Sequence, residues 1–172
     1  LAGCAALGLR PAYAGAVGSD DNGRRVTREL AGRGIDLSHL VTREAANQFA
    51  VITVDDRTGE RIVLWDRDDR LMLQPAEVPA ALIAATRLVH VDDVDEAAAI
   101  RAATLARDAG VPATSDLDRV TDRTMALVAA VSIPIFAEHV VPAITGEADY
   151  ERGLRKLRQE HAGMLCITLG PR

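Results

Sequence analysis

The sequence predicts an α/β protein with a mostly parallel sheet, helices on both faces of that sheet, and one projecting β-hairpin. From residue 75 onward, short apolar runs typical of buried strands alternate with helical patterns. That alternation predicts parallel strands, because a crossover helix is what returns the chain to the same edge of a sheet. Between residues 48 and 65, two β-branched runs flank a turn-forming segment, which predicts the hairpin.

Composition and charge narrow the classes of protein to which the chain can belong. Of its 172 residues, 48% are hydrophobic and 26% are charged, which is ordinary for one globular domain. The net charge is −5, aromatic residues make up 3%, and Lys and Arg form no dense block, so nucleic acid is not an expected partner. No run of 18 apolar residues occurs, so we expect no membrane span and no membrane partner.

The two cysteines, Cys4 and Cys166, lie in apolar surroundings and form no C-x-x-C pair. We therefore expect two buried, reduced thiols, as in a cytoplasmic protein. The segment Leu1-Ala2-Gly3-Cys4 also has the form of a lipoprotein cleavage box. The apolar residues that follow Cys4 favour the end of a helix instead.

In the first part of the chain, the sequence predicts a helix end, a strand and a longer helix. We place them at residues 1–7, 12–17 and 22–34, with Gly18 closing the strand. Asn22 is the expected N-cap of the longer helix, and Val26 and Leu30 are expected on its inner face.

The hairpin has predicted strands at residues 48–54 and 61–65, joined by the turn-forming segment 55–60. Apolar side chains occur on both of its faces, with Val51 on one face and Ile52 on the other. An exposed sheet that is apolar on both sides is an association surface. We therefore predict a homodimer joined through the two strands of the hairpin.

The second part of the chain alternates helices and strands. We expect helices at residues 75–85, 94–110, 121–131 and 150–161, and strands at 87–91, 111–115, 132–136 and 164–168. Val94, Ala98, Ala102 and Leu105 form the expected inner stripe of the second of these helices. Ligands of parallel sheets bind at the carboxyl ends of the strands. The polar residues at those ends are Asp92, Asp93, Asp116, Asp118, Glu138 and the segment 168–170.

Several short motifs occur in an order that is similar to a known family. They are Gly18-Ser19-Asp20-Asp21-Asn22-Gly23, Gly32-Arg33-Gly34-Ile35-Asp36, Thr58-Gly59-Glu60-Arg61, Ile144-Thr145-Gly146 and Ile167-Thr168-Leu169-Gly170. Together they resemble the ribokinase-like (PfkB-type) carbohydrate kinases across nearly the whole chain. The resemblance implies a three-layer ribokinase-like fold over residues 1–172, with the hairpin at about 47–66 acting as a lid.

The resemblance also implies an activity, which is ATP-dependent phosphorylation of a sugar hydroxyl with Mg²⁺. By residue, it implies nucleotide contacts at Thr168 and Gly170, sugar contacts at Gly18, Arg67 and Asp92, and a metal contact at Glu138. Four of these residues also have ordinary structural interpretations. Arg67 belongs to a charge run on a solvated face, Asp92 is suited to cap a helix, Thr168 ends a strand, and Glu138 is a loop carboxylate.

The chain also departs from the family pattern. The family's first sugar-binding strand would precede Leu1, and its G-x-G-D motif, which carries the catalytic base, would follow Arg172. We therefore expect an internal fragment that is inactive alone. The Asn and Glu of the N-x-x-E motif fall on Ala137 and Val140, which leaves Glu138 as the nearest carboxylate. A sugar- or nucleoside-binding paralogue without catalysis is the alternative function.

Overall fold

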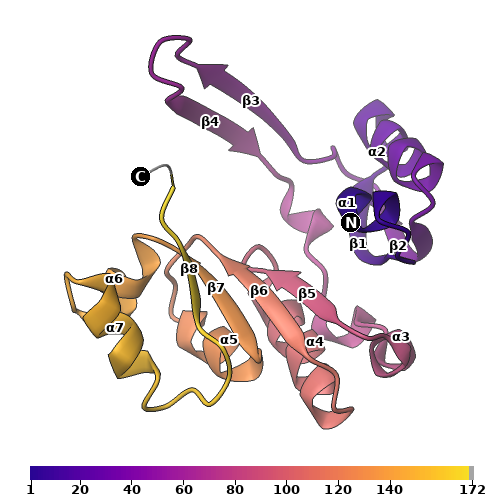
Figure 1. Cartoon of the computed structure of the whole chain (residues 1–172). Helices are drawn as coiled ribbons and strands as arrows, with labels where there is room; N and C mark the ends of the chain where they lie inside the picture. The colour runs from indigo at the N-terminus through magenta and orange to yellow at the C-terminus, as the bar shows by residue number, and fades with distance from the viewer. Residues whose placement is uncertain (171–172) are drawn as a thin grey trace. The chain divides into compact units, whose positions relative to one another are not determined.

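The computed structural model describes residues 1–170, which form two compact units, Leu1–Leu73 and the described residues from Gln74 onward (Figure 1). In the described part of the chain, no helix is both long and apolar enough to cross a membrane.

The first unit is built on two parallel strands connected by a helix. Its elements are α1 (Ala2–Ala6), β1 (Ala12–Gly18), α2 (Asp21–Gly32) and β2 (Asp36–Arg43), followed by the hairpin and the short 3-10 helix η1 (Asp69–Leu71). Strands β1 and β2 pair in parallel. The sequence did not predict β2, because polar side chains occupy five of its eight positions and its strand pattern is weak.

Helix α2 begins one residue earlier than predicted, and its N-cap is Asp20 rather than Asn22. The Asp20 carboxylate accepts a hydrogen bond from the Gly23 amide at 2.9 Å. Gly23 is the buried residue of the helix, whereas Val26 remains 37% exposed and does not form an inner face. A Cβ atom on Gly23 would lie 1.8 Å from the carbonyl oxygen of Gly18, so glycine is what lets α2 approach the end of β1.

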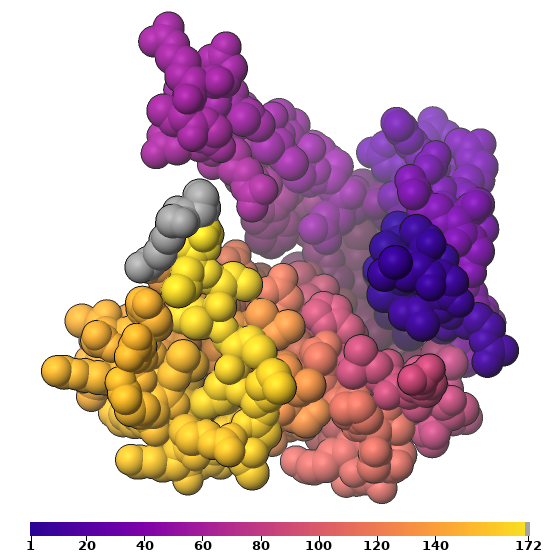
Figure 2. Space-filling view, viewed as in Figure 1, coloured from indigo at the N-terminus to yellow at the C-terminus, as the bar shows by residue number. Residues whose placement is uncertain are grey.

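The hairpin is confirmed. Strands β3 (Phe49–Val54) and β4 (Arg61–Asp66) pair antiparallel, with Val51 opposite Leu64 and Ile52 opposite Val63. Every residue of both strands is exposed, and in Figure 2 the hairpin projects from the rest of its unit. Gly59 in the connecting loop has a φ of 73°, which glycine adopts without steric cost.

The second unit contains the predicted parallel sheet. Its strands run in the order β5 (Val89–Asp92), β6 (Ala113–Leu117), β7 (Ile133–Ala137) and β8 (Cys166–Thr168), and all neighbouring strands are parallel. The helical elements are η2 (Pro75–Glu77), α3 (Ala80–Ala85), α4 (Glu96–Asp108), α5 (Thr124–Ala130), α6 (Val140–Thr145) and α7 (Tyr150–Leu157). Pro79 divides the first predicted helix into η2 and α3, and α6 was not predicted.

The core of this unit lies between one face of the sheet and its helices. Leu117 and Phe136 on the sheet are fully buried, as is Leu127 on α5. Helix α4 packs against this core with Ala99, Ala103 and Ala106. The predicted stripe is correct at Ala98, which is buried, and at Ala102 and Leu105, which are partly buried against the core, whereas Val94 precedes the helix and is 37% exposed. Alanine side chains allow close approach of a helix to a sheet, which suits a chain with few aromatic residues.

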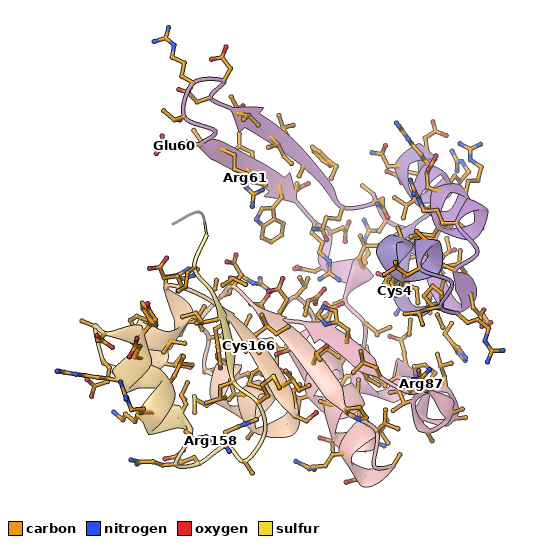
Figure 3. All side chains as sticks on the ribbon, viewed as in Figure 1. Cys4, Glu60, Arg61, Arg87, Arg158 and Cys166 are labelled. Atoms are coloured by element: carbon orange, nitrogen blue, oxygen red, sulfur yellow. The ribbon has the colours of Figure 1, made fainter. Side chains whose placement is uncertain are left out.

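The expectation of buried thiols is wrong. Cys4 is exposed on α1, a helix without buried residues, and Cys166 on β8 is half-buried (Figure 3).

Two serines near the core provide a test of the packing. The Ser115 hydroxyl on β6 is fully buried and has no hydrogen-bond partner among the described residues. Replacing it with alanine should raise the free energy of unfolding by about 1 kcal/mol, because the desolvated hydroxyl contributes nothing in return. Urea denaturation monitored by circular dichroism measures the change.

Ser132 is the matched control for Ser115. Its hydroxyl donates to the Ala113 carbonyl at 2.9 Å and accepts from the Ala113 amide at 2.8 Å. Ser132→Ala should therefore lower the free energy of unfolding by about 1 to 2 kcal/mol. A destabilising Ser115→Ala variant would show that the packing around β6 differs from that described above.

Candidate active site

The carboxyl ends of the four parallel strands bring the predicted polar residues of the second unit to one edge. Asp92 pairs with Asp116 across β5 and β6, and Ala137 pairs with Thr168 across β7 and β8. Glu138 follows Ala137 directly and is exposed. The structure therefore gathers Asp92, Glu138 and Thr168 along one edge of one sheet.

Asp92 and Asp93 follow the same strand but have different environments. Asp92 is exposed, and its carboxylate accepts from the Val94 amide at 3.0 Å in the loop before α4. The N-cap of α4 is Asp95, so the helix-capping interpretation of Asp92 is wrong. Asp93 is only 6% exposed, and its carboxylate accepts from the Asp118 amide at 2.8 Å and the Arg119 amide at 2.6 Å. Asp93 thus binds the loop that follows the neighbouring strand.

The loop after β7 carries Glu138 and His139. A ring nitrogen of His139, Nε2, lies 2.7 Å from the Asp118 carbonyl oxygen. A carbonyl oxygen only accepts, so the His139 ring donates this hydrogen bond. The sequence carries no local signal for this contact of His139, because its partner is a backbone atom 21 positions away.

Thr168 and Gly170 lie at the end of β8. The Thr168 hydroxyl donates to the Phe136 carbonyl at 3.3 Å, and its side chain is exposed. Gly170 has a φ of 66°, and an added Cβ atom would meet nothing within 4 Å. The backbone at this glycine is therefore accessible to a ligand, although a side chain would be conformationally strained there.

Gly18 lies in the first unit, at the end of β1. Its amide donates to the Asn47 side-chain oxygen at 2.9 Å, and the Asn47 amide donates to Asp20 at 3.1 Å. Hydrogen bonds from the backbone amides of Gly23 and Asn47 hold the pKa of Asp20 below its ordinary value. These contacts attach the segment that precedes the hairpin to the end of β1.

Arg67 and Arg70 lie just past the hairpin, and both contact the backbone. Arg67 is half-buried and donates to the Leu71 carbonyl at 3.0 Å. Arg70 donates to the Glu44 carbonyl at 2.6 Å and forms an ion pair with Asp68. Hydrogen bonds from Arg70 lower the pKa of Asp68 to about 2. Arg70 therefore joins the two ends of the hairpin at its base, a role that the charge run in the sequence did not reveal.

The donor groups at the sheet edge suit a hard cation such as Mg²⁺. Asp92, Asp116, Asp118 and Glu138 are all exposed carboxylates. Within residues 1–170, no three or more His, Cys, Asp or Glu side chains are grouped so that they could hold a metal by themselves. Mg²⁺ usually binds through one or two carboxylates and keeps waters and phosphate oxygens as its other ligands. A single carboxylate such as Glu138 fits that mode of binding.

Comparison with known proteins agrees with the family resemblance of the sequence motifs. A family model described as pfkB family carbohydrate kinase matches residues 2–172. A protein from Agrobacterium tumefaciens assigned as a ribokinase is 30% identical, with a TM-score of 0.88 over 99% of this chain and 57% of its own. A search of curated proteins gave no match.

Two more distant structures share the fold. The adenosine kinase from Sinorhizobium meliloti is 20% identical, with a TM-score of 0.80 over 98% of this chain and 56% of its own. A protein from Escherichia coli assigned as a ribokinase II, solved with ATP and Mg²⁺, is 17% identical, with a TM-score of 0.75 over 96% of this chain and 59% of its own. The ribokinase-like fold is thereby confirmed, and the chain spans less than two thirds of each of these proteins.

The close packing at Gly18 can be tested by substitution. A Cβ atom there would lie 2.4 Å from the Ala45 carbonyl oxygen and 2.5 Å from the Asn47 amide nitrogen, both of them backbone atoms. Gly18→Ala should lower the free energy of unfolding by about 1 to 3 kcal/mol, because neither neighbour can rotate away.

The exposed Gly32, where an added Cβ atom would meet nothing within 4 Å, is the control for Gly18. Gly32→Ala should change the stability by less than about 0.5 kcal/mol. Chemical denaturation of both variants makes the comparison, and equal stabilities would refute the packing argument.

Proposed function

Because the chain belongs to the pfkB family of carbohydrate kinases, we propose that the protein containing it transfers the γ-phosphoryl group of ATP to a sugar hydroxyl. Residues 1–172 form part of one kinase domain in this proposal, and the hairpin at about 47–66 is its lid. The observation that carries the proposal is the family match, which extends over the strand ends where Glu138, Thr168 and Gly170 gather.

Each site residue has a proposed role. Thr168 and Gly170 bind the nucleotide, since the hydroxyl and the uncovered backbone lie at the same strand end. Glu138 holds the water shell of Mg²⁺. The sugar is bound by Gly18, Arg67 and Asp92. Gly18 and Arg67 act mainly by fixing the backbone at the base of the lid.

Phosphoryl transfer relies on positioning and on charge stabilisation rather than on covalent chemistry by the protein. When bound, Mg²⁺ would neutralise the charge that develops on the phosphate oxygens. The residues of this chain orient the groups around the transfer: Glu138 accepts hydrogen bonds from water, and the Thr168 hydroxyl exchanges its bond to the Phe136 carbonyl for one to an anionic oxygen.

A second candidate function is a binding protein of the same fold without catalysis. Val140 occupies the position of the family's N-x-x-E glutamate, and its side chain is completely buried. That position therefore cannot supply a metal contact in this protein. A nucleoside is the alternative substrate class, since an adenosine kinase shares the fold.

We also propose a cytoplasmic location, which is the compartment that supplies ATP to sugar kinases. Free cysteines in a chain of this composition are in keeping with a reducing compartment.

The kinase proposal is tested with the full-length protein that contains residues 1–172. It should release ADP in the presence of Mg²⁺, ATP and one member of a panel of sugars, and residues 1–172 alone should not. Glu138→Gln should lower kcat/KM about 10- to 100-fold and raise the Mg²⁺ requirement.

Glu160→Gln is the control for Glu138→Gln, because Glu160 is exposed on the helical side of the unit, after α7. Its kinetics should equal those of the unmodified protein. Tight binding of ATP or sugar without turnover by the full-length protein would instead favour the binding-protein function.

We further propose that the full-length protein is a homodimer joined through β3 and β4. Large apolar side chains are exposed along both strands, with Ile62 and Leu64 each 65% exposed and Val54 59%. Covering such a surface gives about 25 cal/mol for each Å² of apolar area removed from water. A second hairpin with the same pattern is a suitable cover.

Sedimentation velocity tests the dimer. The double variant Val51→Lys with Ile52→Lys puts a charge on each face of the hairpin and should give monomers with an unchanged α/β core. The control variant, Val120→Lys with Met125→Lys, alters two exposed apolar residues of the second unit and should remain dimeric. A monomeric unmodified protein, or a dimer that survives the hairpin variant, would rule out this interface.

A further inference from the structure

We propose that Asp93 and His139 are positioning residues that fix the backbone of Glu138 by linking three loops at the carboxyl edge of the sheet. The inference rests on the proposed function, since it concerns how Glu138 is held for Mg²⁺. It assigns roles to two side chains for which the sequence motifs give none.

The first link joins the loop after β5 to the loop after β6. One carboxylate oxygen of Asp93, Oδ2, accepts from the amides of both Asp118 and Arg119, at 2.8 and 2.6 Å. The Arg119 guanidinium completes the contact, with its Nε 3.4 Å from the other carboxylate oxygen and its Nη2 donating to the Asp93 carbonyl. A carboxylate that is 92% buried and satisfied by backbone donors is a rigid anchor, because removing either partner leaves a buried group unpaired.

The second link joins the loop after β6 to the loop after β7. The His139 ring donates from Nε2 to the Asp118 carbonyl at 2.7 Å. Asp118 is therefore held on both sides, with its amide bound to Asp93 and its carbonyl bound to His139. The His139 side chain makes no capping bond to α6, although His139 is the N-cap residue of that helix. Its ring instead binds the loop after β6.

The two links leave Glu138 between fixed neighbours. On one side, Ala137 is paired with Thr168 in the sheet. On the other side, His139 is held by Asp118, and Val140 and Val141 are completely buried. The backbone of Glu138 is thus restrained at both ends, whereas its side chain is exposed at the strand edge.

Restraint of this kind matters for a residue that orients metal-bound water. A ligand group must keep its geometry to within a fraction of an ångström, and partners in the surrounding shell supply that constraint. Loss of such a partner typically costs about 10- to 100-fold in metal affinity or activity. A purely structural role for His139 would affect unfolding but not the dependence on Mg²⁺.

The kinetic experiment uses the full-length protein and three single variants. His139→Leu removes the ring donor, and His139→Gln retains an N–H donor at a similar reach. His90→Leu is the control, because His90 is also an exposed histidine, with its Nδ1 2.8 Å from the Thr114 hydroxyl on the adjoining strand. The Mg²⁺ concentration that gives half-maximal rate should rise about 10-fold in His139→Leu. It should return most of the way to the original value in His139→Gln and stay unchanged in His90→Leu.

Hydrogen exchange gives a second readout that does not depend on activity. Amide exchange at residues 138–141 should accelerate in His139→Leu. In Asp93→Asn, acceleration should extend from residues 118–119 to residues 138–141, because the two loops share Asp118. A change confined to 118–119 in Asp93→Asn would overturn the proposed linkage.

Different results would contradict the positioning role and the proposed kinase function. A working kinase whose Mg²⁺ dependence is the same in His139→Leu and His90→Leu overturns the positioning role alone. A full-length protein that phosphorylates no sugar or nucleoside overturns the proposed function, and the inference about Mg²⁺ falls with it.

Discussion

The side-by-side pairing of four parallel strands, β5 to β8, is the constraint on which the candidate site depends. Strands that run in one direction bring their carboxyl ends to one edge, and the register decides which residues become neighbours there. The register pairs Asp92 with Asp116 and Ala137 with Thr168. A slip of one residue would move the polar side chains of β6 onto the core face and expose Leu117, which is completely buried. The free energy needed to expose the core therefore fixes which residues are neighbours at the carboxyl edge of the sheet.

Packing with small residues makes that register possible in a chain with few aromatic residues. Ala103 and Ala106 of α4 are completely buried against a core that contains Leu117 and Phe136. Small side chains bring helix and sheet close together, and dispersion contacts then accumulate over many atoms. A short side chain such as that of Asp93 is then long enough to reach the loop of the adjacent strand.

The strands of the second unit could be predicted because short runs containing apolar or β-branched residues alternate there with helical patterns, whereas contacts between loops could not. The N-cap of α2 illustrates the limit: Asp20, Asp21 and Asn22 are all good capping residues, and the tertiary contact from the Asn47 amide favours Asp20. Strand β2 was not predicted because five of its eight residues are polar. The roles of Asp93 and His139 depend on backbone partners at least 21 positions away, and local patterns carry no signal for such partners.

Val140 lies at the position of the family's N-x-x-E glutamate but belongs to the hydrophobic core of this chain. The family motif has a carboxylate there, but in this chain the side chain is completely buried and belongs to the core that contains Leu127 and Phe136. An ionised group at that depth would need a partner to offset its desolvation. In the proposed function, the carboxylate for Mg²⁺ comes instead from the exposed turn before α6, where Glu138 lies. A residue on a turn starts with more backbone freedom than one within a helix, so its geometry has to be imposed by neighbouring contacts. The bond from His139 to the Asp118 carbonyl is a contact of that kind, and it lies one residue from Glu138.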